Sequence, residues 1–313
     1  MTHAPARLVA DIGGTHSRFA IAQGGSIQDA VTYRNVDFGS LQAAAQQYLS
    51  GLGKPVREAC LAVAAPIKGD EVQLVNHDWR FSQRALAAAL GVERLGVIND
   101  FEAIAHALPQ LTPADLAAVG GGEAEAGAPV VVIGPGTGLG VGLRVPAREG
   151  ATVVSTEGGH ACLGARDETE AALLREVLRA GLYPSRELLV SGSGLELLHR
   201  LVCGHGVGER LLDAATIQQR AVEGGDAGCV AALRHFCAFL GTAAGDQALG
   251  CGARGGVFIA GGIVRRFVPF LRQSDFRARF EERGPMTHYT QRIPTCVICH
   301  DNPGLLGAAH APL

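Results

Sequence analysis

The sequence predicts an α/β protein built from two similar domains. Its 313 residues, 47% of them hydrophobic, can bury two cores at about 150 residues per domain. A series of three short strands occurs twice along the chain. Glycine-rich turns follow short apolar runs at three distant places: Asp11-Ile12-Gly13-Gly14-Thr15, Gly134-Pro135-Gly136-Thr137-Gly138 and Ala260-Gly261-Gly262.

The first half of the chain begins with a predicted antiparallel hairpin and continues as alternating strands and helices. Continuous apolar runs bounded by proline or glycine, as in 60–65, are typical of strands buried on both faces. We expect strands ending at Val9 and covering 18–22, 31–35, 60–65 and 95–98, with helices over 41–48, 82–90 and 101–108.

The pattern of three strands starts again after a Gly/Glu/Ala-rich stretch at 120–129, which we interpret as a surface loop. Predicted strands cover 130–133, 140–145, 152–155, 256–260 and a segment near Cys296, and predicted helices cover 168–179, 195–202, 214–222 and 229–250. We therefore expect a small α/β domain over 1–109, completed by 301–313, and a large α/β domain over 110–300.

The three glycine-rich turns are candidate phosphate-binding sites. Glycine has no Cβ, so successive backbone N–H groups can approach an anion closely. A single such turn is more often an ordinary hairpin. Three of them, each at a strand end, favour a nucleotide-phosphate site.

Asn99 and Asp100 directly follow the predicted strand 95–98 and precede a predicted helix. Ligands of open α/β sheets bind at the carboxyl ends of strands, which favours a reacting carboxylate here. A helix cap explains the same two residues equally well from position alone. The balance is changed by a second polar cluster, Glu157-Gly158-Gly159-His160, which can present a carboxylate and an imidazole to a polyhydroxyl ligand.

Charge and cysteine usage exclude several classes of function. The net charge of -3 and a pI near 6.4 speak against nucleic-acid binding. The two lysines, Lys54 and Lys68, fit neither a P-loop nor a protein-kinase strand. The Cys296-Val297-Ile298-Cys299-His300 spacing matches a haem-attachment pattern, yet the segment reads as a buried strand and the second half of a zinc site is missing. We expect neither haem nor zinc.

Residues 1–9 contain no apolar core of signal-peptide length, and no continuous apolar run reaches the ~18 residues of a membrane span. We expect a cytoplasmic protein without membrane or nucleic-acid partners.

Together these segments resemble the bacterial ATP-dependent glucokinases, of the hexokinase and actin-like superfamily, over almost the whole chain. The resemblance is carried by the Asp11–Thr15 turn, Ile98-Asn99-Asp100-Phe101, the turn within 133–140, Glu157–His160, Phe258–Ile263 and His300-Asp301-Asn302-Pro303-Gly304. It implies two actin-like (ribonuclease H-like) domains with a cleft between them.

The resemblance also implies roles for particular residues. Asp100 would accept the proton of the sugar 6-hydroxyl, and Asn99 would hold neighbouring hydroxyls. The other edge of the ring would be held by Glu157, His160 and Glu187. Asp11 would orient Mg²⁺ through water, while the phosphates and adenosine of ATP would contact Gly13, Gly14, Thr15, Gly136, Thr137, Gly138, Gly261 and Gly262.

The expected reaction is transfer of the γ-phosphoryl group of ATP to glucose, with ATP and Mg²⁺ as cofactors and a homodimer as the expected assembly. Phosphorylation of another hexose (mannose, fructose or N-acetylglucosamine) is the alternative within enzymes. An actin-like regulatory ATPase or a sugar-responsive regulator is the alternative from another class. Repressor-type sugar kinases carry a Cys-rich zinc motif after their Gly-His pair, but here Ala161-Cys162-Leu163-Gly164 leads straight into Arg166.

Overall fold

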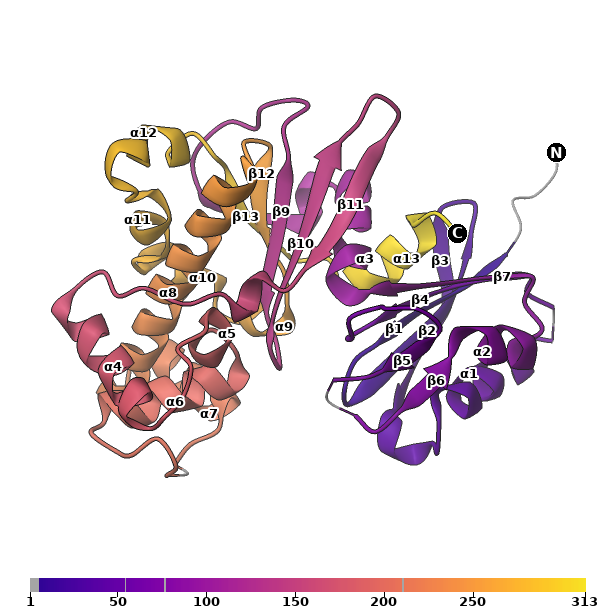
Figure 1. The fold of residues 1–313 in the computed structure, drawn as a ribbon, viewed down its shortest axis with the longest axis horizontal. Coiled ribbons are helices and arrows are strands. Elements are labelled where there is room, and N and C mark those ends of the chain that lie inside the picture. Colours follow the sequence, from indigo (N-terminus) through magenta and orange to yellow (C-terminus); the bar gives the residue numbers. More distant parts are fainter. Residues whose placement is uncertain (1–5, 54, 76, 210) are drawn as a thin grey trace. The chain divides into compact units, whose positions relative to one another are not determined.

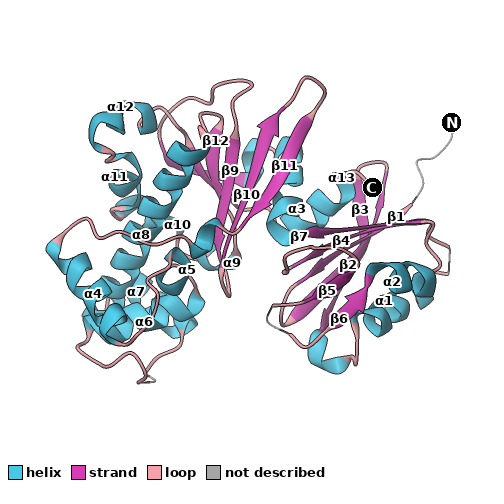
Figure 2. Ribbon diagram, in the orientation of Figure 1, coloured by secondary structure: helices cyan, strands magenta, loops and turns pink. Residues whose placement is uncertain are grey.

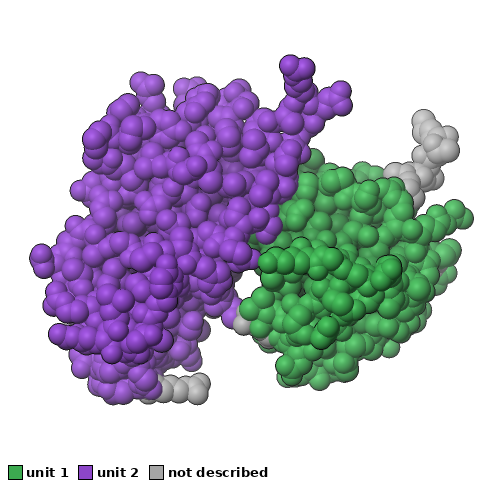
Figure 3. Space-filling model, in the orientation of Figure 1, with its two compact units in different colours: residues 1–111, 300–313 green, residues 112–299 purple. Residues whose placement is uncertain are grey.

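The computed structural model describes residues 6–53, 55–75, 77–209 and 211–313. Lys54, which entered the P-loop argument, and residues 1–5 of the signal-peptide argument lie outside these ranges. The chain divides into two compact units, coloured separately in Figure 3. Unit 1 comprises Met1–Leu111 and His300–Leu313, and unit 2 comprises Thr112–Cys299.

Unit 1 is built on a five-stranded sheet with the order β3-β2-β1-β4-β7 (Figure 1). The first three strands pair antiparallel, and β4 pairs in parallel with β1 and β7. Its strands are β1 (Arg7–Ile12), β2 (His16–Gln23), β3 (Ser26–Arg34), β4 (Glu58–Val63) and β7 (Arg94–Asn99), beside a small hairpin of β5 (Glu71–Gln73) and β6 (Arg80–Ser82). The run in β4 is buried on both faces, as its apolar composition predicts.

The two faces of this sheet are covered by different helices. Alternate residues of β1 separate into two cores: Leu8 packs with α1 (Leu41–Ser50) and α2 (Gln83–Leu90), and Val9 packs with α3 (Asp100–Ala107) and α13 (Pro303–His310). Helix α13 lies unusually close to α3, because a Cβ on Gly307 would overlap the Ala103 carbonyl oxygen. The C-terminal segment is thus an integral part of unit 1.

Unit 2 contains a six-stranded mixed sheet with the order β11-β10-β9-β12-β13-β8 and a group of helices packed beside it (Figure 2). The strands are β8 (Leu116–Gly120), β9 (Val130–Pro135), β10 (Leu139–Pro146), β11 (Ala151–Thr156), β12 (Gly256–Ile259) and β13 (Thr295–Ile298). The helices are α4 (Glu168–Arg179), α5 (Arg186–Leu189), α6 (Gly192–Val202), α7 (Ala214–Glu223), α8 (Ala227–Cys251), α9 (Gly262–Arg265), α10 (Val268–Gln273), α11 (Phe276–Glu281) and α12 (Thr287–Thr290).

Helix α8 is the central helix of unit 2. By length and composition its 25 residues could cross a membrane, but 67% of its most apolar window is buried inside the protein. Helix α8 is not a continuous apolar run, because Arg234, His235 and Asp246 lie within it, and it therefore agrees with the expectation that no such run reaches ~18 residues. The buried residues of α8 join the main core of unit 2 with β9 and β12.

The predicted longer elements are present, whereas several short ones were missed. Helix α4 has the predicted bounds, and α7 and α8 extend the predicted ranges by one to three residues. The short elements β8 and α5 were not predicted, although the equally short strands β12 and β13 were, because an apolar run alone does not distinguish a short strand or helix from a loop. The two mixed sheets, each packed against helices, confirm the predicted α/β class.

Candidate functional site

The first glycine-rich turn connects β1 to β2, and a buried asparagine forms hydrogen bonds with its backbone. The Gly13 amide donates to the carbonyl of His16 at 3.0 Å. Asn35, fully buried, donates through Nδ2 to the Gly13 carbonyl at 2.8 Å, and its own amide donates to the Thr15 carbonyl at 2.9 Å. Its Oδ1 accepts the hydroxyl of Ser17 at 2.7 Å. These contacts fix the turn through the Gly13 amide and the carbonyls of Gly13 and Thr15. They do not use the amides of Gly14 and Thr15.

Asp11, at the end of β1, is a half-buried carboxylate with one cationic neighbour. Arg18 approaches its Oδ2 at 3.5 Å, and the side chain of Asp11 is 24% exposed. Burial raises the pKa of Asp11 and Arg18 opposes that rise. A Cβ on Gly304, in the first turn of α13, would lie 2.9 Å from the Asp11 carboxyl carbon. Glycine at position 304 thus allows the helix to start beside this carboxylate.

From sequence position alone, Asn99 and Asp100 could be helix caps or reacting groups. The structure distinguishes the two residues. Asn99 is the cap of α3, and its Oδ1 accepts the amides of Phe101 at 2.9 Å and Glu102 at 3.3 Å. Asp100 is the first residue of the helix and does not act as its cap. Asn99, and not the Asp100 carboxylate, is therefore the cap of α3.

Asp100 has a strongly shifted pKa. Burial raises it from 3.8 to about 7, and the nearby Asp11 carboxylate adds to the rise. Hydrogen bonds from the backbone of Phe101 and from Asn99 act in the opposite direction. The reference value for an aspartate describes a weak base, whereas a carboxylate with a pKa near 7 is suited to accept a proton at neutral pH.

The second turn joins β9 to β10 and contacts Glu187. Glu187 Oε2 accepts the amide of Leu139 at 2.8 Å, and a Cβ on Gly138 would overlap that oxygen. Gly136 donates to the Gly138 carbonyl at 2.8 Å, and its own carbonyl accepts the amide of Gly192 at the start of α6. The predicted phosphate turn Gly136-Thr137-Gly138 is thereby fixed between a carboxylate and a helix start.

The Glu157–His160 segment forms a single 3₁₀ turn after β11. The imidazole of His160 lies between two carboxylates, with Glu157 Oε2 at 3.8 Å from Nε2 and Glu187 Oε1 at 4.0 Å from Nδ1. The structure therefore brings together the three residues predicted to hold the sugar ring in this unit. Glu157 and His160 are mostly exposed, as binding of a hydrophilic ligand requires.

Close packing explains why residues 158 and 159 of this segment are glycines. A Cβ on Gly159 would overlap the Leu139 carbonyl oxygen, and one on Gly158 would overlap the Gln247 side chain. The Glu-Gly-Gly-His segment thus lies directly against β10 and α8.

The third turn follows β12. Gly261 has a left-handed φ of 97°, and a Cβ there would overlap the Pro135 carbonyl oxygen. A Cβ on Gly262 would meet open space. Gly261 is required by the close approach to β9, while Gly262 leaves the backbone accessible at the start of α9.

Within each unit the structure groups the predicted residues, and it adds supporting ones that sequence reasoning missed. Unit 1 contains Asp11, the first turn, Asn99 and Asp100; unit 2 contains the second and third turns, Glu157, His160 and Glu187. Asn35 was missed because an isolated asparagine between a strand and a helix has no distinctive pattern. Only its burial identifies its role.

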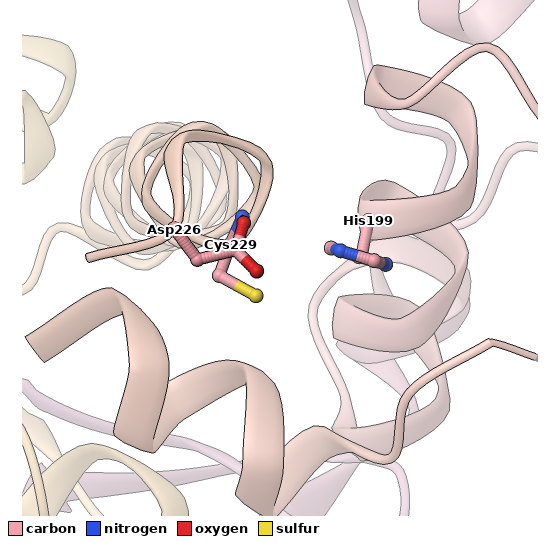
Figure 4. Close-up of side chains that lie close together, drawn as sticks. All are labelled: His199, Asp226 and Cys229. Carbon is pink, nitrogen blue, oxygen red and sulfur yellow. The ribbon is translucent and has the colours of Figure 1, made fainter. Parts of the chain in front are cut away.

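A separate group of potential metal ligands lies among the helices of unit 2. In the described part of the chain, His199, Asp226 and Cys229 form the only group of three or more His, Cys, Asp or Glu residues whose ligand atoms lie within 4.8 Å of one another. Figure 4 shows His199 of α6 facing the start of α8, where Asp226 is the cap and Cys229 lies in the first turn.

Protein contacts account for most of this group. The Asp226 carboxylate accepts the Cys229 amide at 3.0 Å as the cap of α8, and its other oxygen lies 3.6 Å from Arg220. His199 Nε2 lies 3.7 Å from the Cys203 sulfur, and burial lowers the pKa of His199. The helix cap and the guanidinium already compensate the only carboxylate. Neither Cys296 nor Cys299 belongs to this group.

The fold defines a class of protein, the sugar kinases with two actin-like domains. The family model described as Glucokinase matches residues 8–312, and this chain belongs to the glucokinase family.

Individual relatives agree with this assignment. A glucokinase from Chromobacterium violaceum is 44% identical over 306 residues, covering 97% of this chain and 88% of that protein. The crystal structure of a glucokinase from an Antarctic psychrotroph is 40% identical, with a TM-score of 0.86 over 97% of this chain and 98% of that one. A ROK family glucokinase from Streptomyces griseus, solved in complex with glucose and AMPPNP, shares the fold at 18% identity, with a TM-score of 0.65 over 97% of this chain and 98% of that one.

The raised pKa of Asp100 predicts a pH-dependent effect on stability. The folded protein retains the Asp100 proton up to about pH 7, whereas the unfolded carboxyl releases it near pH 4. Folding is therefore increasingly opposed as the pH rises from 4 to 7, and the loss is complete above pH 7. Asp100→Asn should gain stability over wild type through this window, levelling off on the order of 1–3 kcal/mol after allowance for partial exposure.

Urea unfolding of the ligand-free protein between pH 5 and pH 8.5 measures this difference. Glu149→Gln, at an exposed turn, is the control for removal of one carboxylate. A difference between Asp100→Asn and wild type that stays constant over this pH range would contradict the raised pKa.

Proposed function

We propose that this protein is an ATP-dependent glucokinase that transfers the γ-phosphoryl group of ATP to the 6-hydroxyl of glucose, giving glucose 6-phosphate and ADP. Membership of the glucokinase family over residues 8–312 supports the reaction class. The observation that carries the proposal is Asp100: a carboxylate at the end of β7, released from helix capping by Asn99, with a pKa of about 7.

The roles proposed for the residues are those that the resemblance to the glucokinases implies. Asp100 orients the attacking hydroxyl and receives its proton, and Asn99, in addition to capping α3, binds neighbouring hydroxyls. Glu157, His160 and Glu187 bind further hydroxyls of the sugar. Phosphoryl transfer has a loose transition state, so positioning and charge compensation account for most of the catalysis. Backbone N–H groups of the turns at Gly13–Thr15 and Gly136–Gly138 stabilise the phosphates, and Gly261 and Gly262 give the adenosine access to the backbone.

A divalent cation suits the charges of unit 1. Asp11 and Asp100 are close enough for the charge on one to raise the pKa of the other, and Arg18 is the cation that approaches Asp11. Asp11 would hold Mg²⁺ through water, and Mg²⁺ supplies neutralisation of phosphate charge when bound. We propose that no zinc or haem takes part.

The remaining parts of the proposal concern organisation. We propose that unit 1 and unit 2 correspond to the small and large domains of the family, and that the protein is a cytoplasmic homodimer without nucleic-acid or membrane partners. Helix α8, the one described helix apolar enough to suggest a membrane span, is mostly buried.

An ADP-release assay with glucose, mannose, fructose, N-acetylglucosamine and no sugar tests the function. We expect turnover that depends on sugar and is highest with glucose, and EDTA inhibition that Mg²⁺ alone reverses. Highest turnover with another hexose would favour a kinase for that sugar, and sugar-independent turnover would favour a regulatory ATPase. A need for added Zn²⁺ after EDTA would contradict the absence of a zinc site.

Replacing the proposed base should affect kcat far more than nucleotide binding. Asp100→Ala removes the proton acceptor and is expected to lower kcat by at least ~10²-fold, with little change in the affinity for ATP. Steady-state kinetics with a folded variant measure both quantities. A kcat close to that of wild type would limit Asp100 to a structural role at the start of α3.

Replacing residues of the sugar turn should affect the KM for glucose. Glu157→Gln removes the charge and one acceptor oxygen, and His160→Ala removes the imidazole; loss of a hydrogen bond to a hydroxyl costs about 1–3 kcal/mol in binding, or about 5- to 150-fold in KM. Glucose and ATP titrations of both variants separate the effects on the two substrates. Unchanged glucose kinetics in both variants would place this turn outside the sugar site.

A further inference from the structure

Three charged side chains form a network behind the Glu157–His160 turn. Arg186 begins α5, Asp246 belongs to α8, and Arg283 follows α11. The side chains of Arg186 and Arg283 are 12% and 5% exposed, and that of Asp246 is 36% exposed. The proposed function assigns no role to any of the three.

Arg186 joins the turn to the element that carries Glu187. Its Nη1 donates to the Gly158 carbonyl at 3.3 Å, inside the turn, and its backbone amide donates to the Ala161 carbonyl at 2.9 Å, just after the turn. Arg186 therefore contacts the turn on both sides of His160. The next residue is Glu187, so a movement of Arg186 changes the position of all three proposed sugar ligands of unit 2.

Asp246 fixes the guanidinium of Arg186. Its Oδ2 accepts from Arg186 Nη2 at 3.3 Å, and its Oδ1 lies 3.6 Å from Arg283 Nε. The Nε atoms of both arginines are buried without a hydrogen-bond partner among the described residues, so the carboxylate is the main compensation for two adjacent positive charges. Burial lowers the pKa of Arg283, and Asp246 opposes that change.

Arg283 connects this pair to the backbone of unit 2. It donates to the carbonyls of Gly241 at 3.3 Å and Thr242 at 2.8 Å in α8, and to that of Arg279 at 2.7 Å in α11. Residue 245 is a glycine, and a Cβ at this position would overlap the guanidinium of Arg283. The absence of a side chain at Gly245 therefore allows Arg283 to approach α8. The network thus extends from the turn to the central helix of the unit.

We propose that Asp246 is a positioning residue which, through Arg186, holds the Glu157–His160 turn in register with Glu187 and so sets the discrimination between hexose epimers. The inference rests on the proposed function. A buried ion pair with a partly exposed carboxylate is weak support for stability, because desolvation offsets much of the attraction. Its geometric effect is specific, since a planar guanidinium fixes a carbonyl and a carboxylate at defined angles.

Two substitutions test this role with little change in shape. Asp246→Asn removes the charge, and Arg186→Lys removes the fork that bridges Gly158 and Asp246. Each should raise the KM for glucose about tenfold with the KM for ATP changed less than about twofold. The ratio of kcat/KM for glucose to that for mannose or galactose should fall about fivefold or more. Asp246→Glu, which keeps the charge, should recover part of the loss.

The epimer ratio distinguishes positioning from a loss of folded protein, because it does not depend on the fraction of active enzyme. Glu125→Gln, which breaks the exposed ion pair with Arg254 in the same unit, is the matched control and should leave the ratio unchanged. An equal loss of kcat/KM for all sugars, or a parallel rise in the KM for ATP, would overturn the proposal.

Two further outcomes are also decisive. Failure of Asp246→Asn and Arg186→Lys to fold, while Glu125→Gln folds, would assign the network to stability alone and overturn the positioning role. Wild-type protein that phosphorylates none of the sugars would refute the proposed function itself, and it would do so independently of the variants.

Discussion

The contact between Glu187 and the turn after β9 is the interaction on which the site in unit 2 depends. One carboxylate oxygen accepts the Leu139 amide and lies where a side chain on Gly138 would be, while the other oxygen faces His160. A single side chain thus connects a proposed phosphate turn to the proposed sugar ligands. Since the carboxylate fits only against glycine, the turn sequence is constrained by Glu187 as well as by any phosphate.

In unit 1 the glycine-rich turn is also supported by a polar side chain, but the residues differ from those in unit 2. Asn35 replaces the carboxylate as the buried support of a glycine turn, and Gly304 rather than Gly138 provides the close approach, here between α13 and Asp11. In both units a rigid group behind the turn satisfies inner polar atoms and leaves the outer N–H groups available to a ligand. Preorganised donors of this kind need no rearrangement when charge develops.

The candidate site residues could be identified from the sequence, whereas the residues that support them could not. Gly138, Asp100 and His160 stand in recognisable motifs, and their neighbourhoods follow from strand ends. Asn35 and Asp246 stand in no motif, and each is identified only by what the fold brings to it from distant segments. Periodicity predicted α4 within its bounds but could not distinguish α5, whose four residues carry Glu187. The predicted roles of the site residues remain predictions.

Asp100 in unit 1 lies near a like charge, whereas Asp246 in unit 2 lies between two opposite charges. This difference corresponds to the roles proposed for the two residues. In unit 1 the carboxylate proposed to accept a proton lies near a second carboxylate, and burial together with repulsion from Asp11 raises the pKa of Asp100 to about 7. In unit 2 the residues behind the turn are opposite charges in contact, with Asp246 between two arginines. Like charges make a protonation state easy to change, whereas opposite charges with forked geometry make a position hard to change. The role proposed for Asp100 requires the first property, and the role proposed for Glu157, His160 and Glu187 requires the second.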